Sequence, residues 1–391
     1  MSATAARLVG EQYYRVTLPL AGAVNHMKAA IFTSVPYQGP APRGMWPVPS
    51  ESFSSDVAER SVAASLEQFE LADQLGFDWV TLAEHHFAPM SLTPNPMVMA
   101  GALTQRVKRA RIALLGANIP ILNPVRVAEE FAMLDTLTGG RVVAGMLRGT
   151  SNEYVTYAVN PAESRDRFEE ALQLIVRAWT EPQPFGWQGR YFEYRTISIW
   201  PKPVQKPYPP IYMSGSSPES GEFAARHRLS LGFAFTTVPL ASKAVRYYRE
   251  QARGCGWEPT PDDVLYRLAV HVADSDAAAH DDLIAAGLTQ HRGGLSTANP
   301  ALDNAAARAG YYGRDQDNQR GRLQVHDFAE RIQLGQLLVG SPSTVLDQIR
   351  TIQEELGAGI LDLIFQPVGR DKTLKSIELF GTQVLPRMQQ L

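Results

Sequence analysis

Short apolar runs alternate with longer amphipathic stretches over most of the chain. The apolar runs are bounded by Gly, Pro or Asn and lack a regular polar face, which is typical of parallel strands buried on both sides. In the stretches between them, apolar residues recur every three or four positions, as on one face of a helix. We expect eight strands, at Met27–Phe32, Phe77–Leu82, Arg111–Ile121, Val142–Leu147, Ile211–Met213, Leu231–Phe235, Leu265–Val272 and Ile360–Phe365.

Helices are expected in the intervening stretches. Eight strands separated by helices are the count of a (β/α)₈ TIM barrel, which is an α/β fold. An open doubly wound sheet would usually carry a Gly-rich fingerprint after its first strand, and the chain has no G-x-G-x-x-G, P-loop, H-E-x-x-H or G-x-S-x-G motif. The apolar helix faces are marked by Val62, Leu66, Phe69 and Ala72, by Phe168, Leu172, Ile175 and Trp179, and by Val345, Ile349, Ile352 and Leu356.

The barrel is expected to be a single domain over residues 27–391, with insertions at its C-terminal face. Two segments are too long for simple connections, at about 182–208 and about 280–336, and we interpret the second as a candidate lid. The Pro36–Ser55 loop is also long enough to suggest a function. Residues 1–26 are expected to be an N-terminal extension, because their one apolar run, although it resembles a short signal segment, is broken by Pro19.

Composition narrows the class of protein. The 391 residues carry 37 Lys and Arg against 40 Asp and Glu, a net charge of −3, which gives no electrostatic case for binding nucleic acid or a membrane surface. The single cysteine, Cys255, rules out an internal disulfide and fits a reducing, cytoplasmic compartment. No apolar run approaches transmembrane length.

Polar residues follow the second predicted strand directly, as Glu84-His85-His86. The exits of parallel strands form the edge at which α/β folds build their active sites. Adjacent side chains in extended chain point to opposite faces, so one histidine can face a pocket while the other packs. The two cannot easily bind one metal ion together, and we expect no metal site. A structural role is about as common as a catalytic one for such histidines.

Two further polar clusters follow the fourth and fifth strands, at Arg148-Gly149-Thr150 and at 214–221. The second opens a helix with several serines, and free backbone N–H groups at a helix start attract anions such as phosphate. Arg148 at the neighbouring strand exit could reach the same anion. The alternatives are that one serine only caps the helix and that Arg148 pairs with a structural carboxylate.

A family resemblance rests on a series of motifs in constant register. They are Ala83-Glu84-His85-His86-Phe87 with Leu92-Thr93-Pro94-Asn95-Pro96, then 123–130, Leu134-Asp135, Gly139-Gly140-Arg141 and Leu147-Arg148-Gly149. From about Met27 to the C-terminus the chain resembles the bacterial luciferase-like flavin-dependent monooxygenases, especially those of the luciferase α-subunit type. That family has the TIM-barrel fold, so the resemblance agrees with the strand count.

The resemblance implies a role for each site residue. Arg148, Ser216, Ser217 and Ser220 match the family's flavin phosphate site. Gly116, Ala117 and Asn118 match the backbone that lies against the flavin ring, often at a non-proline cis peptide bond, and Glu84 belongs to the same cofactor site. His85 matches the histidine that handles protons around the reduced flavin and its oxygen adduct.

The implied chemistry is oxygenation. Reduced FMN would react with O₂ to give a C4a-(hydro)peroxide, with His85 as general base, and transfer oxygen to an organic, largely apolar small molecule. Leu147 and Ser151 replace a cysteine and a tyrosine of some luciferases, which weakens the case for light emission or an aldehyde substrate. We expect a dry wall for the site from apolar residues near the strand exits, namely Phe87, Met90, Met146, Leu147, Phe233 and Phe235.

Two partners follow from the same resemblance. A separate flavin reductase should supply the reduced FMN, because no nicotinamide fingerprint is present. A homodimer is expected through the helices that flank the second and third strands. The helix from Val125 to Leu137 carries Val127, Phe131 and Leu134, more apolar surface than an exposed barrel helix needs. Two alternatives stay open: a deazaflavin (F420)-dependent oxidoreductase on the same fold, and a non-catalytic flavin-binding partner subunit.

Overall fold

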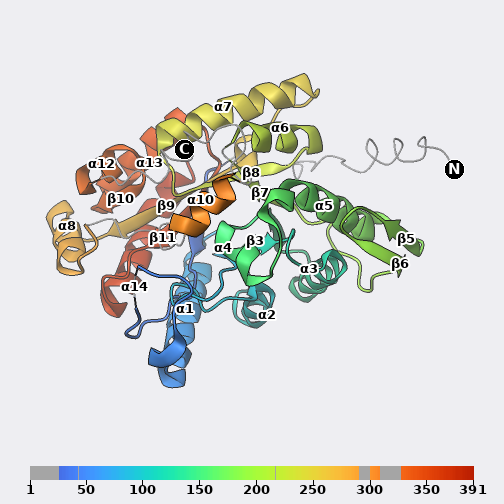
Figure 1. Ribbon diagram of the computed structural model, residues 1–391. Coiled ribbons are helices and arrows are strands. Elements are labelled where there is room, and N and C mark those ends of the chain that lie inside the picture. The colour runs from blue at the N-terminus through green and yellow to red at the C-terminus, as the bar shows by residue number, and fades with distance from the viewer. Residues whose placement is uncertain (1–25, 43, 216, 290–299, 309–326) are drawn as a thin grey trace.

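The predicted strands form a closed ring of parallel strands surrounded by helices (Figure 1). The computed structural model describes residues 26–42, 44–215, 217–289, 300–308 and 327–391. Neighbours in the ring follow the order β1, β2, β3, β4, β7, β8, β9 and β11, and β11 pairs back onto β1. The TIM-barrel prediction is confirmed. The ring strands are β1 (Lys28–Phe32), β2 (Trp79–Leu82), β3 (Arg111–Asn118), β4 (Val142–Leu147), β7 (Ile211–Ser214), β8 (Ser230–Ala234), β9 (Val264–Val272) and β11 (Ile360–Phe365).

Helices cover the outside of the ring (Figure 1). None of the helices in the described ranges is both long and apolar enough to cross a lipid bilayer. The helices between ring strands are α1 (Ser55–Leu75), α2 (Pro96–Arg106), α3 (Pro124–Thr138), α4 (Ser151–Thr156), α5 (Ser164–Thr180), α6 (Pro218–His227), α7 (Val238–Gly254), α8 (Asp276–Ala285), α10 (Pro300–Arg308), α12 (Phe328–Gln333) and α13 (Pro342–Leu356). After β11 the chain forms α14 (Arg370–Leu379), a π-helical turn (Phe380–Val384) and α15 (Leu385–Met388).

One strand that pairs with the ring was missed by the sequence pattern. β10 (Leu337–Gly340) and β8 pair with the same edge of β9. β8 pairs with its amino-terminal half and β10 with its carboxyl-terminal half. It has only four residues and comes directly after the stretch assigned to the second insertion. A buried run of that length cannot be distinguished from a helix fragment by periodicity alone.

The insertion at 182–208 does not lie at the C-terminal face. It forms an antiparallel hairpin of β5 (Phe185–Gln188) and β6 (Glu193–Ile197), which lies beside α5 in Figure 1. Gln205, which follows the hairpin, bonds to the carbonyl of Val142 at 2.8 Å, where β4 begins. The reason is topological, because a segment that connects a helix to the next strand returns to the amino-terminal edge of the barrel.

The second insertion is described only in part, since residues 290–299 and 309–326 lie outside the described ranges. Within it, α10 packs against α4, and the buried side chains of Ala306 and Tyr154 belong to one apolar cluster. Because α4 follows the exit of β4, this part of the insertion lies on the carboxyl side of the barrel, as expected.

Residues inside the ring and residues behind it alternate along each strand. The interior layer contains Trp79 and Tyr212, whose rings meet edge to face at 5.3 Å. Above it, the buried Asp362 accepts hydrogen bonds from Thr81 and from Arg267 at 2.7 and 2.6 Å. The lumen is therefore filled by side chains, and a ligand must bind above them, at the carboxyl-terminal mouth.

Candidate active site

The segment that leaves β2 places three titratable side chains at the mouth of the barrel. Glu84 and His86 are buried, at 3% and 5% exposure, and their side chains bond to each other at 3.1 Å. The side chain of His85 points differently and keeps 22% of its surface exposed. This is the alternation expected of adjacent residues in extended chain.

A fourth side chain, Glu153 on α4, joins the two histidines. Its Oε1 lies 3.1 Å from Nδ1 of His85, and its Oε2 lies 3.6 Å from Nε2 of His86. Glu153 is 1% exposed, so its carboxylate is almost fully removed from water. A buried carboxylate requires compensating partners: His85 supplies a hydrogen bond, and His86 lies close enough for an electrostatic interaction only.

The carboxylates of Glu84 and Glu153 affect the pKa of His86 and that of Tyr157, the residue that follows α4. Burial opposes the protonated form of His86, but the hydrogen bond to Glu84 and the charges of Glu153 and Glu84 outweigh it and raise the pKa of His86. Burial and the same two carboxylates raise the pKa of the Tyr157 phenol. The ring of Tyr157 meets that of His86 edge to face at 5.1 Å.

The exit of β3 connects to this cluster through the main chain. The backbone N–H of Asn118 donates to Oε2 of Glu84 at 3.1 Å. Just before it, the Leu115–Gly116 peptide bond is cis, and the β3–β4 register shifts between Leu114 and Ala117. A side chain at Gly116 would collide with the carbonyl of Gly145 on β4. Gly116, Ala117 and Asn118 thus lie at the mouth, where the sequence placed them.

The predicted phosphate site brings together the exits of two neighbouring strands. β4 pairs with β7, so Arg148 after β4 and the start of α6 after β7 lie at adjacent edges. Ser217 caps α6: its side chain accepts from the N–H of Ser220, and the two hydroxyl oxygens lie 3.1 Å apart. Ser217 therefore has a capping role in the structure, and its role in binding phosphate stays a prediction. Ser216 lies outside the described residues.

Arg148 has a neutral partner in the structure. Its Nη1 donates to Oγ of Ser164 at 3.3 Å, at the first residue of α5. The next residue, Arg165, reaches Glu219 in the first turn of α6 at 4.0 Å. These contacts tie the starts of α5 and α6 to the exit of β4.

The Pro36–Ser55 loop packs onto the segment that carries the histidines. The indole N–H of Trp46 donates to the carbonyl of His86 at 3.0 Å. The N–H of Val48 donates to the carbonyl of Phe87 at 3.0 Å. The loop thereby fixes the backbone on the exposed side of the site.

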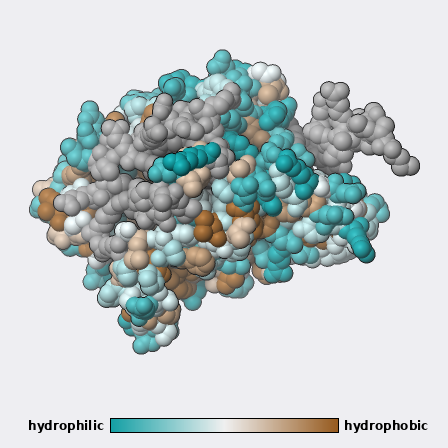
Figure 2. Space-filling model, in the orientation of Figure 1, coloured by the Kyte–Doolittle hydropathy of each residue, from teal (hydrophilic) through white to brown (hydrophobic). Residues whose placement is uncertain are grey.

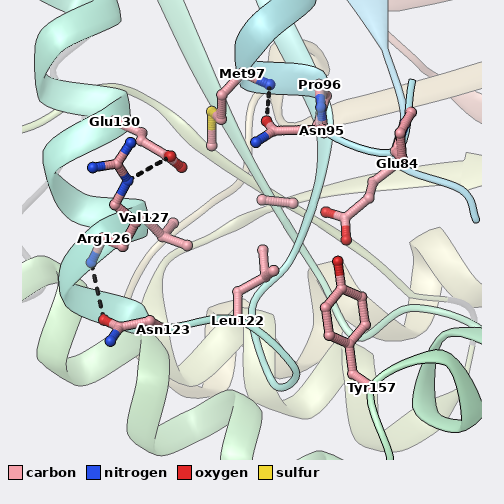
Figure 3. Close-up of a pocket in the computed structure, with 12 residues that line it drawn as sticks. Glu84, Asn95, Pro96, Met97, Leu122, Asn123, Arg126, Val127, Glu130 and Tyr157 are labelled. Atoms are coloured by element: carbon pink, nitrogen blue, oxygen red, sulfur yellow. Dashed lines mark hydrogen bonds and ion pairs between the residues drawn. The ribbon is translucent and has the colours of Figure 1, made fainter. Parts of the chain in front are cut away.

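A small cavity lies behind Glu84, between the starts of α2 and α3 (Figure 3). The carboxylate of Glu84 and the hydroxyl of Tyr157 point toward each other on one side of it. Asn95 and Asn123 cap the two helices, each followed by a proline at the first helical position. Arg126, on the far wall, bonds to Glu130 at 2.8 Å.

A sequence model of the family described as "Luciferase-like monooxygenase" matches residues 43–359, which include every described site residue and all the ring strands except β1 and β11. The chain belongs to the luciferase-like monooxygenase family. The resemblance inferred from the sequence motifs is confirmed.

Curated relatives of this family carry several activities. The chain is 26% identical over 340 residues to 4-hydroxyprotoasukamycin monooxygenase from Streptomyces nodosus subsp. asukaensis, covering 84% of this chain and 87% of that protein. A shorter match, 27% identical over 165 residues, covers 41% of this chain and 45% of the oxygenase component of a flavin-dependent trigonelline monooxygenase from Acinetobacter baylyi.

Solved structures show the same fold. The oxygenating constituent of 3,6-diketocamphane monooxygenase from Pseudomonas putida, in complex with FMN, aligns with a TM-score of 0.72 at 20% identity, over 93% of this chain and 99% of that one. An F420-dependent secondary alcohol dehydrogenase aligns with a TM-score of 0.63 at 19% identity, over 92% and 98%. At these identities the similarity shows the fold and leaves the cofactor open.

The luciferase-like site contains buried polar atoms that fit a polar ligand. Side-chain atoms of Asn118, Thr150, Asn152 and Glu153 are buried without a hydrogen-bond partner among the described residues. Asn118 ends β3, and the other three lie at the start of α4, which follows β4. Because buried polar atoms are nearly always paired in native proteins, this edge is suited to a group with several donors and acceptors, as a flavin ring system has.

The expected apolar wall is partly wrong. Met146 and Phe233 are buried in the shell between strands and helices, because strand alternation turns them away from the lumen. Phe87 and Phe235, at the exits of β2 and β8, are exposed by 54% and 66%, and Met90 by 37%. Figure 2 views this face, where hydrophobic surface lies beside α4.

Sequence reasoning missed Glu153 and Tyr157. Neither belongs to a strand exit or to a quoted motif, because Glu153 lies on the short helix α4 and Tyr157 directly follows it. The one available signal was their position a few residues beyond Arg148-Gly149, on the same edge. No group of three or more His, Cys, Asp or Glu side chains in the described ranges is arranged to hold a metal ion.

Proposed function

We propose that this chain is the oxygenating component of a flavin-dependent monooxygenase, which uses reduced FMN and O₂ to oxygenate a largely apolar organic small molecule. The observation that carries the proposal is the buried Glu84–His86–Glu153–His85 cluster at the mouth of a luciferase-like barrel. Such a cluster can hold and move protons beside a bound cofactor.

Named residues would hold the cofactor. Arg148 and the start of α6, with Ser216, Ser217 and Ser220, would bind the phosphate, because a guanidinium and a helix N-terminus both favour anions. Gly116, Ala117 and Asn118 would lie against the ring, and Glu84 would support them by accepting the N–H of Asn118. The bound flavin supplies the activation of O₂.

His85 would act as the general base. Its Nδ1 is engaged by Glu153, and its ring is the more exposed of the two histidines, so Nε2 is available to a proton of cofactor or substrate. The exposed apolar residues at the mouth, Phe87 and Phe235, support an apolar substrate.

The partners and compartment belong to the same proposal. A separate flavin reductase would deliver reduced FMN, which agrees with the name of the trigonelline relative as an oxygenase component. The cytoplasm is the proposed compartment, since an exposed free cysteine, Cys255, suits a reducing environment.

A homodimer remains part of the proposal, but on different residues. Val127, Phe131 and Leu134 are buried in the core of the single chain, so the argument first made from them is wrong. The exposed apolar side chains on this face are Val98 of α2 and Met133 and Leu137 of α3, exposed by 72%, 52% and 50%. Two-fold pairing would cover them.

Two alternative functions are carried by the same fold. A deazaflavin-dependent oxidoreductase has the same fold, as the F420-dependent neighbour illustrates. A non-catalytic subunit would have no need of a buried His–Glu cluster, whose burial is costly without a function or a stabilising network.

The test is oxygen incorporation. The protein with photoreduced FMN is mixed with ¹⁸O₂ and a panel of aldehydes, ketones, terpenes and aromatics, and products are analysed by mass spectrometry. One labelled oxygen atom in a product is expected. Substrate oxidation by oxidised deazaflavin, or substrate reduction by reduced deazaflavin, in either case without label, would replace the proposal with the hydride-transfer alternative.

A further inference from the structure

We propose that Glu153 is a positioning residue for His85. Its carboxylate fixes the imidazole tautomer, with the proton on Nδ1, and so leaves Nε2 as the basic nitrogen at the barrel mouth. The tautomer stands on geometry alone, whereas its use in catalysis rests on the proposed function.

The contact between the two side chains determines the tautomer. Oε1 of Glu153 lies 3.1 Å from Nδ1 of His85. An ionised carboxylate can only accept hydrogen bonds, and in a neutral imidazole only one nitrogen carries a proton. The proton must therefore be on Nδ1. Nε2 has no hydrogen-bond partner among the described residues, and the ring keeps part of its surface exposed.

The charge of Glu153 also acts on His86, through the second carboxylate oxygen. Oε2 lies 3.6 Å from Nε2 of His86, which bonds to Glu84 at 3.1 Å. The titratable groups of the cluster are thus Glu84, His85 and His86 on one segment, with Glu153 and Tyr157 from the region of α4. Two buried carboxylates face two imidazoles, so the loss of one carboxylate changes the charge around both rings.

The helix that carries Glu153 is itself held in place. The hydroxyl of Tyr154, the next residue, donates to the carbonyl of Arg148 at 2.5 Å. The Tyr154 side chain is buried against Ala306 of α10. A base that is oriented by a fixed third group is the arrangement that activates imidazole in other enzymes.

The tautomer can be tested without any flavin. Long-range ¹H–¹⁵N NMR of ¹⁵N-histidine-labelled protein distinguishes the two neutral tautomers, and the His85 signals among the eight histidines are those lost in His85→Gln. We expect the Nδ1–H form in the wild type. In Glu153→Gln an amide can either donate or accept, so it fixes neither tautomer and a mixture is expected.

The catalytic part is tested by the steady-state kinetics of oxygenation. In Glu153→Gln kcat should fall while KM for the substrate stays nearly unchanged, because the variant misorients the base without removing a substrate contact. The rate should fall by about tenfold or more, but by less than the roughly 10²–10⁴-fold contribution of a general base. The matched control is Glu170→Gln. Glu170 accepts hydrogen bonds from Trp187 and from the backbone of the β5–β6 hairpin, so this variant should lose stability without a fall in kcat.

The possible results distinguish the claim about the His85 tautomer from the claim about its use in catalysis. An Nε2–H tautomer of His85 in the wild type, or an unchanged tautomer in Glu153→Gln, would overturn the inference whatever the protein's activity. The expected NMR result without any oxygenation would leave the positioning contact standing and overturn the proposed function. An equal fall of kcat in Glu153→Gln and Glu170→Gln would show that the effect of Glu153 is structural.

Discussion

His85 and His86 are neighbours in the chain, but their rings have different surroundings. His86 lies between two buried carboxylates and against the ring of Tyr157, whereas His85 has one carboxylate partner and an exposed edge. The first arrangement is that of a structural ion-pair cluster, and the second is that of an oriented base. Their substitutions should therefore have different effects.

His85→Ala should leave flavin affinity nearly unchanged and the protein folded, although Glu153 loses a hydrogen-bond partner, while oxygenation falls by about 10²–10⁴-fold and peroxide is released instead. His86→Ala leaves Glu84 and Glu153 facing each other without the imidazole between them, so it should lower the unfolding free energy by about 3 kcal/mol. Urea unfolding and product assays on both variants measure this. The reverse pattern would mean that the two faces of the segment are assigned the wrong way round.

The raised pKa of His86 predicts how stability depends on pH. A group whose pKa is higher in the folded state contributes stability in full below its unfolded pKa, near 6.5, and loses it as pH rises through the folded value. The difference in unfolding free energy between wild type and His86→Asn should therefore be larger at pH 6 than at pH 9. Denaturant titrations at the two pH values check this, and a difference that grows with pH would contradict the assignment.

Arg148 is the residue on which the phosphate site depends. Replacing it with Ala should weaken FMN binding by about 1.5–3 kcal/mol, the scale of a hydrogen bond to a charged group. Fluorescence titration measures the affinity, with Arg126→Ala as a control, because Arg126 forms an exposed pair with Glu130 on the far wall of the cavity in Figure 3. Equal FMN affinity for wild type and Arg148→Ala would remove Arg148 from the site.

At the scale of elements, the site is assembled by short connections at one edge of the barrel. The apolar runs and the Asn-Pro and Gly signals predicted the ring strands and most helices correctly, because burial of parallel strands and helix capping are local effects. β10 and the β5–β6 hairpin were missed or misplaced, since their positions depend on partners distant in sequence. The Glu153–His85 contact spans β2 and α4 and has no local signal.

The start of α6 offers a prediction at this scale. Ser217 caps the helix whether or not phosphate binds, so Ser217→Ala should lower the unfolding free energy of the flavin-free protein by about 1 kcal/mol. Ser217→Asn retains a capping side chain and should restore stability. If Ser217 also binds the phosphate, FMN affinity should fall in both variants, whereas stability should fall only in Ser217→Ala. That pattern would distinguish the capping role from the binding role.

At the scale of the whole molecule, the face formed by α2 and α3 carries exposed apolar side chains that the single chain does not cover. A homodimer through this face should dissociate when Met133 and Leu137 are both replaced by Glu, because two-fold pairing brings like charges together. Sedimentation velocity at micromolar concentration measures the change. A wild-type monomer would contradict the proposal, and it would leave the barrel and its site unaffected.

The most direct test of the account is a paired anaerobic titration of the protein with reduced FMN and with a reduced deazaflavin, each followed by admission of O₂. We predict that reduced FMN binds at least about tenfold more tightly than the deazaflavin, a difference of roughly 1.4 kcal/mol. The bound FMN should then react with O₂ at a rate that changes in His85→Ala. Tighter binding of the deazaflavin, with no reaction of the complex with O₂, would contradict the central claim.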